Sequence, residues 1–107
     1  MIVVVDTGYL GHIAYTYSNG TRLSMTFGFG SYTENHHRMD LMPSRMMEQY
    51  ESAKPVVSST VEVMAFNNDA LEEFIKVKYD QHPAGHVPVG EIPMLLQVAE
   101  RLDDEIK

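Results

Sequence analysis

The sequence predicts an α/β fold, a mixed sheet covered by helices, in the order strand, strand, strand, helix, strand, helix, helix. Three features carry this prediction: an aliphatic run at residues 2–5, an Asn-Gly pair between two alternating segments, and an amphipathic pattern over the last residues. The chain has 107 residues, of which 44% are hydrophobic, and this is enough for one core. We therefore treat residues 1–107 as a single domain.

The first predicted strand covers residues 2–5 and ends at Asp6, which a Thr-Gly pair follows. A run of aliphatic residues without alternation is typical of a central strand that is buried on both faces. Ligands of open α/β sheets bind at the carboxyl ends of the strands, which makes Asp6 the first candidate functional residue. The simpler alternative is that Asp6 only closes the strand as a turn residue.

The next two predicted strands form a hairpin around Asn19 and Gly20. Asn-Gly between alternating segments favours a two-residue type I′ turn, which fixes the pairing of the strands. That register gives the core one mostly apolar set: His12, Ala14, Thr16, Leu23, Met25 and Phe27. The opposite face carries Tyr15 and Tyr17, which would stack on a ligand or cover a half-exposed sheet.

A helix is predicted over residues 42–53, where methionine, tyrosine and alanine recur at helical spacing until Pro55. Residues 56–66 are rich in β-branched side chains and predict a fourth strand. A right-handed crossover can place this strand parallel to the first and beside it. Asp6 and residues 67–69 would then be neighbours at one end of the sheet.

The last third of the chain predicts a second helix, a loop and a third helix. Residues 70–80 fit either one helix or a short helix followed by an edge strand, and residues 82–90 fit a loop with two prolines and two glycines. The final helix directs five apolar residues inward: Leu95, Val98, Ala99, Leu102 and Ile106.

The net charge of −7 is unevenly distributed. Residues 1–47 sum to zero, whereas residues 48–107 hold 12 acids and 5 bases, and 12 − 5 accounts for the whole charge. Solvated helices explain this most simply, and a polyanion would favour the neutral half. The chain has no cysteine, no apolar run near the ~20 residues that span a bilayer, and no basic leader pattern. We therefore expect a cytoplasmic protein without a membrane partner.

Carboxylate and amide side chains occur at several predicted element ends. Asp6 ends the first strand, Asp40 precedes the first helix, and Asn67 and Asp69 follow the fourth strand. Oxygen ligands of this kind suit Mg²⁺ or Mn²⁺, and two such ions ~4 Å apart can activate a water for phosphodiester cleavage. Helix capping explains Asp40 and Asp69 without any metal.

With these motifs the chain resembles the ribonuclease H-like superfamily over most of its length. Asp6 looks like the acid that ends the first strand of that family. Residues 34–42, with Asp40, are similar to the motif that opens its first helix. Residues 61–69 are similar to its fourth strand and third acid, and residues 82–86 are similar to its late histidine loop.

The resemblance implies metal-dependent hydrolysis of RNA or of an RNA–DNA hybrid. The implied roles are metal binding at Asp6 and Asp40, completion of the site by Asp69 or Asn67, and proton transfer or product release by His82 or His86. The sequence departs from the family where Asp40 replaces a longer Glu and where Met94 stands near the place of a fourth acid. These departures put catalysis in doubt, so a non-catalytic relative is a second form of this hypothesis.

A different class of function is also open: a small acidic module that binds and inhibits a nucleic-acid-handling protein through its negative second half. Two further resemblances are less extensive. Residues 79–82 and 91–96 are loosely similar to segments of flap-type 5′-3′ exonucleases, but the basic residues of that family are absent. The Asp-Thr-Gly triplet at Asp6 is also the short motif of aspartic proteases, which would need a homodimer.

Overall fold

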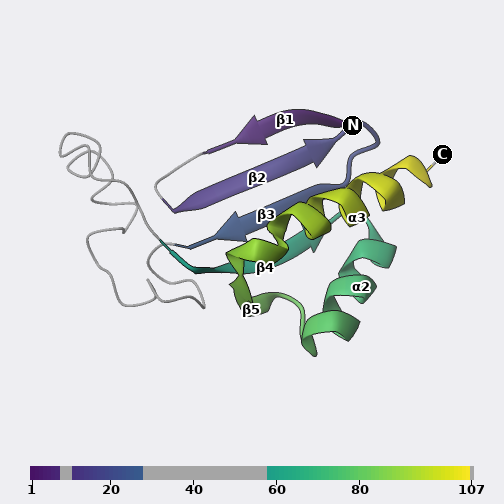
Figure 1. Ribbon diagram of the computed structural model, residues 1–107. Coiled ribbons are helices and arrows are strands. Elements are labelled where there is room, and N and C mark those ends of the chain that lie inside the picture. The colour runs from purple at the N-terminus through teal and green to yellow at the C-terminus, as the bar shows by residue number, and fades with distance from the viewer. Residues whose placement is uncertain (8–10, 28–57, 107) are drawn as a thin grey trace, which may run out of the picture.

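The structure is a computed structural model and describes residues 1–7, 11–27 and 58–106. In these parts an antiparallel sheet of five strands carries two helices on one face (Figure 1). The strands lie in chain order: β1 (Ile2–Asp6), β2 (His12–Tyr17), β3 (Arg22–Thr26), β4 (Thr60–Phe66) and β5 (Ala84–Pro88). Helix α2 (Asp69–Tyr79) connects β4 to β5, and the 3₁₀ turn η3 (Val89–Glu91) leads into helix α3 (Ile92–Asp104).

The predicted mixed sheet, and with it the ribonuclease H-like arrangement, is wrong. Each pair of neighbouring strands is antiparallel, and β4 pairs with β3 instead of lying parallel to β1 and beside it. Strand β1 is consequently an edge strand that pairs only with β2 in the described sheet. Strand β4 pairs with the hydrogen-bonding edge of β3 that the hairpin leaves free. The apolar pattern of β4 does not encode this choice of neighbour.

The β2–β3 hairpin exists as predicted, but its register differs by one residue. Tyr17 N–H donates to Thr21 O at 2.8 Å and Gly20 N–H donates to Tyr17 O at 2.9 Å, which gives a loop of residues 18–20. Gly20 has φ +97°, as expected in a three-residue hairpin loop with a left-handed glycine. Tyr15 therefore pairs with Leu23, and the odd-numbered residues of β2 face the core.

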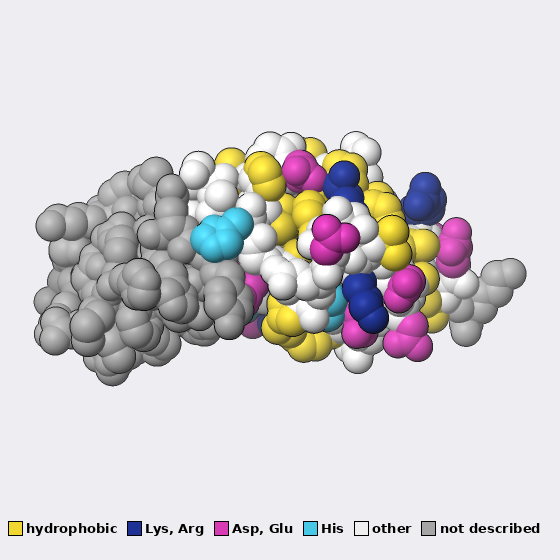
Figure 2. Space-filling model, turned by 90° about the horizontal axis from the view of Figure 1, so that it is seen from below, with side chains coloured by type: hydrophobic (Ala, Val, Ile, Leu, Met, Phe, Trp, Pro, Cys, Tyr) yellow, Lys and Arg dark blue, Asp and Glu magenta, His cyan; other side chains and the backbone are white. Residues whose placement is uncertain are grey.

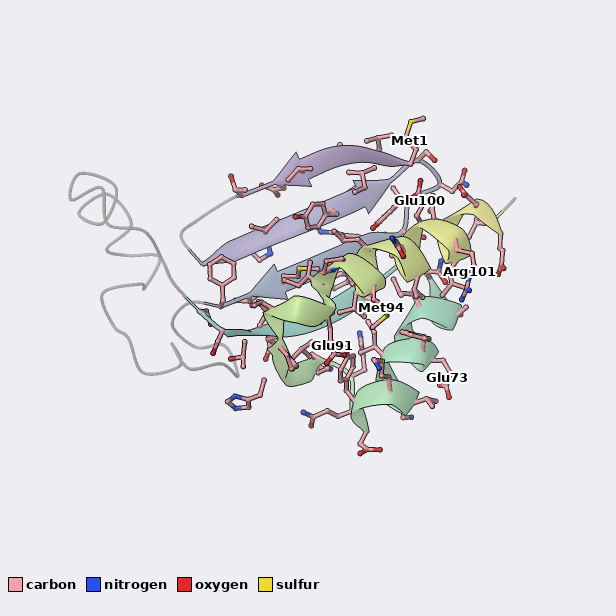
Figure 3. All side chains as sticks on the ribbon, in the orientation of Figure 1. Met1, Glu73, Glu91, Met94, Glu100 and Arg101 are labelled. Carbon is pink, nitrogen blue, oxygen red and sulfur yellow. The ribbon has the colours of Figure 1, made fainter. Side chains whose placement is uncertain are left out.

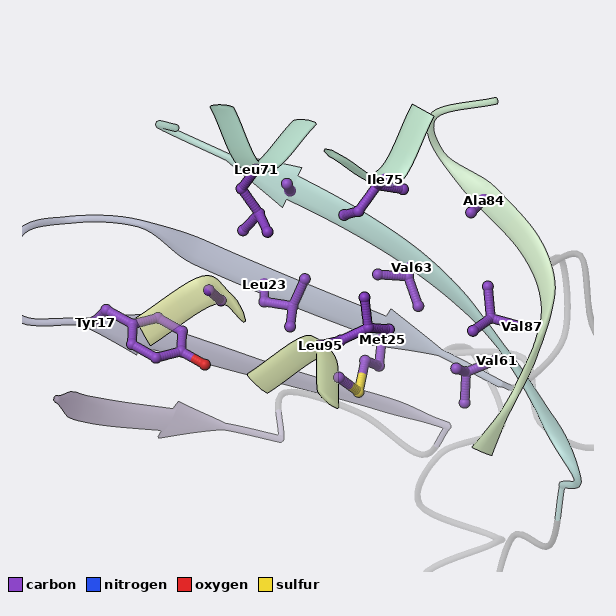
Figure 4. Close-up of a cluster of buried hydrophobic side chains, with 12 residues drawn as sticks. Tyr17, Leu23, Met25, Val61, Val63, Leu71, Ile75, Ala84, Val87 and Leu95 are labelled. Atoms are coloured by element: carbon purple, nitrogen blue, oxygen red, sulfur yellow. The ribbon is translucent and has the colours of Figure 1, made fainter. Parts of the chain in front are cut away.

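The core lies between the sheet and the helices (Figure 4). Leu71 and Ile75 of α2 and Leu95 of α3 have no exposed side-chain surface, and they meet Leu23 and Val63 of the sheet. The remaining buried members of this cluster are Tyr17, Met25, Val61, Ala65, Ala84, Val87 and Ala99. Tyr17 also donates its hydroxyl to Leu96 O at 2.9 Å, which fastens β2 to α3. The predicted inward face of the last helix is confirmed at Leu95 and Ala99, while Val98, Leu102 and Ile106 are half-buried.

Helix α2 and strand β5 correct two predictions for the second half of the chain. It runs without interruption to Tyr79, so residues 70–80 form no edge strand, and β5 lies within residues 82–90, where a loop is predicted. The helix begins one residue earlier than capping by Asp69 requires, because Asn68 accepts a hydrogen bond from Leu71 N–H at 3.1 Å. Asp80 ends it with φ +65°, a conformation that Asp tolerates better than most residues.

Asp103, near the end of α3, connects the helices to the hairpin loop. It is fully buried, and its carboxylate accepts from Asn19 N–H at 3.0 Å and from Thr21 N–H at 3.1 Å. The Asn19 side chain donates back to Asp103 O at 2.9 Å. Asn68 Nδ2 donates to Thr21 Oγ1 at 3.0 Å, so the same loop also contacts the N-cap of α2. The chain of contacts fixes the hairpin against both helices.

The predicted helix at residues 42–53 and the start of the strand at residues 56–57 lie outside the described residues. Among the described helices, none combines the length and the apolar character that crossing a membrane requires.

Candidate functional site

Asp6, the first candidate from the sequence, lies at the end of β1 on the sheet face opposite the helices. Its partner is a cation: Asp6 Oδ2 is 3.5 Å from Arg22 Nη2 of β3. Arg22 Nη1 also donates to Thr16 Oγ1 at 3.3 Å, so the guanidinium spans β2. The carboxylate is thus neutralised by a base, whereas a metal site would surround it with further oxygen ligands.

A histidine and a serine, which sequence reasoning did not single out, meet on the same face. His12 Nε2 and Ser24 Oγ are 3.0 Å apart. Burial lowers the pKa of His12, and Arg22 lowers it further, while Asp6 opposes this shift. The imidazole is therefore neutral at pH 7 and can accept the serine proton. With the observed length of the hairpin loop, the alternation of residues in β2 and β3 would have predicted that His12 and Ser24 lie on the same face of the sheet.

The His12–Ser24 pair has the residue types of a base and a nucleophile. The backbone around Ser24, however, is engaged in the hydrogen-bonded ladders of the sheet. Ser24 is 9% exposed and lies in a strand that pairs on both sides, with Ala14 on one and Met64 on the other. Hydrolysis by such a pair needs free N–H donors for the oxyanion. Neighbouring N–H groups in a central strand already serve the two ladders, so we assign the pair to sheet stability.

Asp69 and Asn67 do not join Asp6. Asp6 aligns with Ala14, Ser24 and Met64 across the sheet, so β4 is three strand spacings away, roughly 14 Å at about 4.8 Å each. The chain then runs on to the opposite end of the sheet before Asp69 opens α2 (Figure 1). One ion with ligands at about 2.1 Å cannot bridge that separation. Asn67 instead donates to Gly20 O at 3.2 Å.

His82 has a structural partner on each ring nitrogen. Its Nε2 accepts the N–H of Ala65 at 2.8 Å, and Nδ1 lies 3.6 Å from Glu72 Oε1. Strand β5 begins at Ala84, opposite Val63, so the imidazole takes the place of the next ladder partner for β4. His82 and His86 also line a shallow hollow together with Gln81 and Pro83. Both ring nitrogens of His82 thus have contacts within the fold, and its proton-transfer role stays a prediction from the sequence.

The predicted metal site is not assembled by the part of the chain that the structure describes. Within residues 1–7, 11–27 and 58–106, no three His, Asp or Glu side chains are grouped so that they could hold one ion. Asp40, the second predicted ligand, lies outside the described residues. The expectation of Mg²⁺ or Mn²⁺ therefore stays a prediction from the sequence.

The acidic second half, the other predicted contact surface, does not present a uniform field in Figure 2. Acidic side chains there alternate with Lys, Arg and apolar groups over the helices. In Figure 3, Glu73 lies on α2 and Arg101 lies near the end of α3, while Glu91 lies at the start of α3. Glu91 has two partners, because Tyr79 Oη donates to its Oε1 at 2.6 Å and Lys78 Nζ is 3.7 Å from the same oxygen.

The most unusual surface of the described fold is β1 itself. Its aliphatic residues keep large exposed fractions: 39% for Ile2, 53% for Val3, 50% for Val4 and 56% for Val5. The helices lie over β2 to β5 and leave most of this strand uncovered (Figure 1). The run that predicts a buried central strand is therefore an apolar sheet edge.

Comparisons with known proteins identify no relative: no family model, no curated protein and no solved structure matches this chain.

Proposed function

We propose that this chain is a small protein-interaction module that binds an extended strand of its partner along the free edge of β1. The observation that carries the proposal is the exposure of four consecutive aliphatic residues, Ile2 to Val5, on a strand that pairs only with β2 among the described residues. An uncovered edge strand presents unpaired N–H and C=O groups to a partner strand. Main-chain hydrogen bonds then supply affinity, and the side chains supply selectivity.

The two edges of the sheet differ in a way that supports this choice. Strand β5 is preceded by Pro83, ends at Pro88 and carries a register shift with His86 at φ +54°. Prolines and bulges are devices that keep an edge from pairing. Strand β1 also has a register shift, between Ile2 and Val4, but it contains neither proline nor a basic residue. The β1 edge is accordingly the one that is open to a strand.

The size of the contact indicates reversible binding. Full burial of one aliphatic side chain contributes about 1.5–3 kcal/mol, so burial of the exposed half of each of the four contributes about 4 kcal/mol in total. Each new backbone hydrogen bond adds about 0.5–1.5 kcal/mol. Loss of rotational and translational freedom costs about 4–15 kcal/mol, so the strand alone supports association that depends on concentration.

The nuclease hypothesis receives no comparable support from the described residues. Its acids do not converge there, and Asp6 is neutralised by Arg22. The earlier idea of a protein-binding module is retained, with the contact surface moved from the acidic helices to β1.

Site-specific photo-crosslinking tests the proposal. A benzophenone amino acid replaces Val3 on β1 or, as the control, Val77 on α2, which is 70% exposed and apolar. On irradiation in cells that naturally express the chain, we expect a discrete protein adduct at Val3 and none at Val77. A second change, Val5→Lys, should abolish the adduct. Adducts that are equal at both positions, or absent at Val3, would overturn the proposal.

A further inference from the structure

Resting on the proposed function, we infer that the strand bound by β1 is β1 of a second copy of this chain. The two strands run antiparallel about a two-fold axis near Val4, the middle residue of Ile2–Asp6. An isologous contact of this kind brings the same surface of each subunit together. The two sheets then become one continuous sheet, in which the exposed β1 edge of each copy is paired.

The distribution of charge favours a second copy. In the described residues up to Phe27, the Asp, Glu, Lys and Arg side chains are Asp6 and Arg22 alone, and these two pair at 3.5 Å. All of the net charge of −7 resides in residues 48–107. Two copies that meet at β1 therefore join neutral surfaces.

Of the two helices, α2 stays at a distance from β1 in this arrangement. Helix α2 packs against β4 and β5 at the far side of the sheet, several strand spacings of about 4.8 Å from β1. Charges separated by more than the Debye length of about 8 Å at physiological ionic strength are largely screened. Glu100 of α3 is the acid nearest the start of β1, and it is 3.4 Å from the Met1 amine (Figure 3).

The side chains of β1 are also self-complementary. With the axis at Val4, Val3 lies opposite Val5 of the second copy and Val4 lies opposite itself, so aliphatic groups meet aliphatic groups. Val5 pairs with Tyr15 and shares its sheet face, which is the face of the helices. A two-fold axis perpendicular to the sheet puts both helix layers on that face, on either side of the joined strands. Asp6 falls at the end of the pairing, where it keeps Arg22 as its partner.

Cysteine scanning gives a direct test, because the chain has no cysteine of its own. Single variants Val3→Cys, Val4→Cys and Val5→Cys are oxidised at equal concentration, with Val77→Cys as the exposed control. On the axis, Cα atoms of opposite residues lie about 4.5–5.5 Å apart, within disulfide range. One residue away, two identical positions are about 8 Å apart and outside it.

We expect a disulfide-linked dimer at one β1 position, Val4, at least about tenfold more abundant than at its neighbours or at Val77. No dimer at any β1 position, or equal dimer at Val77, would overturn the inference.

Sedimentation velocity over a concentration series provides the second measurement. The unmodified chain should associate to a dimer, and Val4→Lys should weaken the dimer about tenfold or more, because it places two like charges at the axis. Val77→Lys should leave association unchanged. A chain that stays monomeric at all concentrations refutes the inference even where Val4→Lys fails to fold.

The two proposals fail separately. A monomeric chain that still crosslinks to a different protein at Val3 contradicts the second copy and supports the interaction module. A chain that neither self-associates nor crosslinks at Val3 contradicts both.

Discussion

Replacement of Asp103 by asparagine tests whether one buried carboxylate holds the hairpin loop to α3. The carboxylate accepts two backbone N–H groups, from Asn19 at 3.0 Å and Thr21 at 3.1 Å. A hydrogen bond to a charged group contributes about 1.5–3 kcal/mol, and a neutral one about 1 kcal/mol. Asparagine keeps one acceptor oxygen but turns an amide donor toward the other N–H. We expect the free energy of unfolding at pH 7 to fall by about 3 kcal/mol.

The dependence on pH identifies the charge as the cause. Burial by itself raises the pKa of Asp103, but hydrogen bonds from the Thr21 side chain and from the Asn19 and Thr21 N–H groups lower it more, so the net shift is downward from 3.8. A carboxyl with a lowered folded pKa stabilises the fold above its unfolded pKa and loses that contribution as pH falls through the folded pKa. The difference between the two proteins should be constant from about pH 5 to 8 and narrow below pH 3.8.

Urea denaturation followed by circular dichroism at several pH values measures both effects. Asp104→Asn is the matched control, because Asp104 is the exposed neighbour in the same helix and should change stability by less than about 0.5 kcal/mol. A loss below that value for Asp103→Asn, or a difference that persists unchanged to the lowest pH, would refute the assigned role.

Three other changes probe separate contacts. His82→Ala should cost about 1–3 kcal/mol, because it leaves a buried N–H of β4 without its acceptor, whereas the exposed His86→Asn should be nearly neutral in the same urea assay. Gly20→Ala should cost about 1–2 kcal/mol from its φ of +97° alone, since a Cβ there meets no atom within 4 Å; a larger loss of melting stability would point to a clash. Burial raises the pKa of Tyr17 from 10.0 to about 12, so the unmodified chain should lose stability between those pH values. Tyr17→Phe should reduce this alkaline loss in pH-dependent urea unfolding, and the raised pKa of Tyr79 accounts for the loss that remains.

Most local elements were predictable from the sequence, with β5 as the exception, and their mutual arrangement was not. The Asn19-Gly20 pair correctly locates the hairpin, and the apolar spacing from Leu95 to Ile106 correctly indicates α3. One extra loop residue, however, exchanges the two faces of β2, so Tyr15 and Tyr17 face the helices while Ala14 does not. Side chains alternate with a period of two, which makes any face assignment sensitive to a single residue in the turn.

The prediction of the candidate site failed for the same reason, because it depended on how the elements are arranged in space. Asp6 ends its strand as predicted, but its distance from Asp69 depends on the order of strands, which is a long-range property. The aliphatic run of β1 was informative about strand formation and misleading about burial. A strand that a partner covers has the same composition as one that the chain covers itself.

The ion pair at the end of β1 gives Asp6 a role consistent with this edge. A pair with side chains 47% and 32% exposed contributes about 0–1 kcal/mol to stability, so its value to folding is small. Its relevance is to pairing, because an uncompensated carboxylate on an edge strand costs desolvation free energy when an aliphatic strand packs beside it. With Arg22 beside it, the edge is close to neutral and accepts a partner strand. In the proposed pairing, Asp6 lies at the end of the paired segment. The charge of Arg22 offsets the unfavourable effect of the Asp6 carboxylate on that pairing.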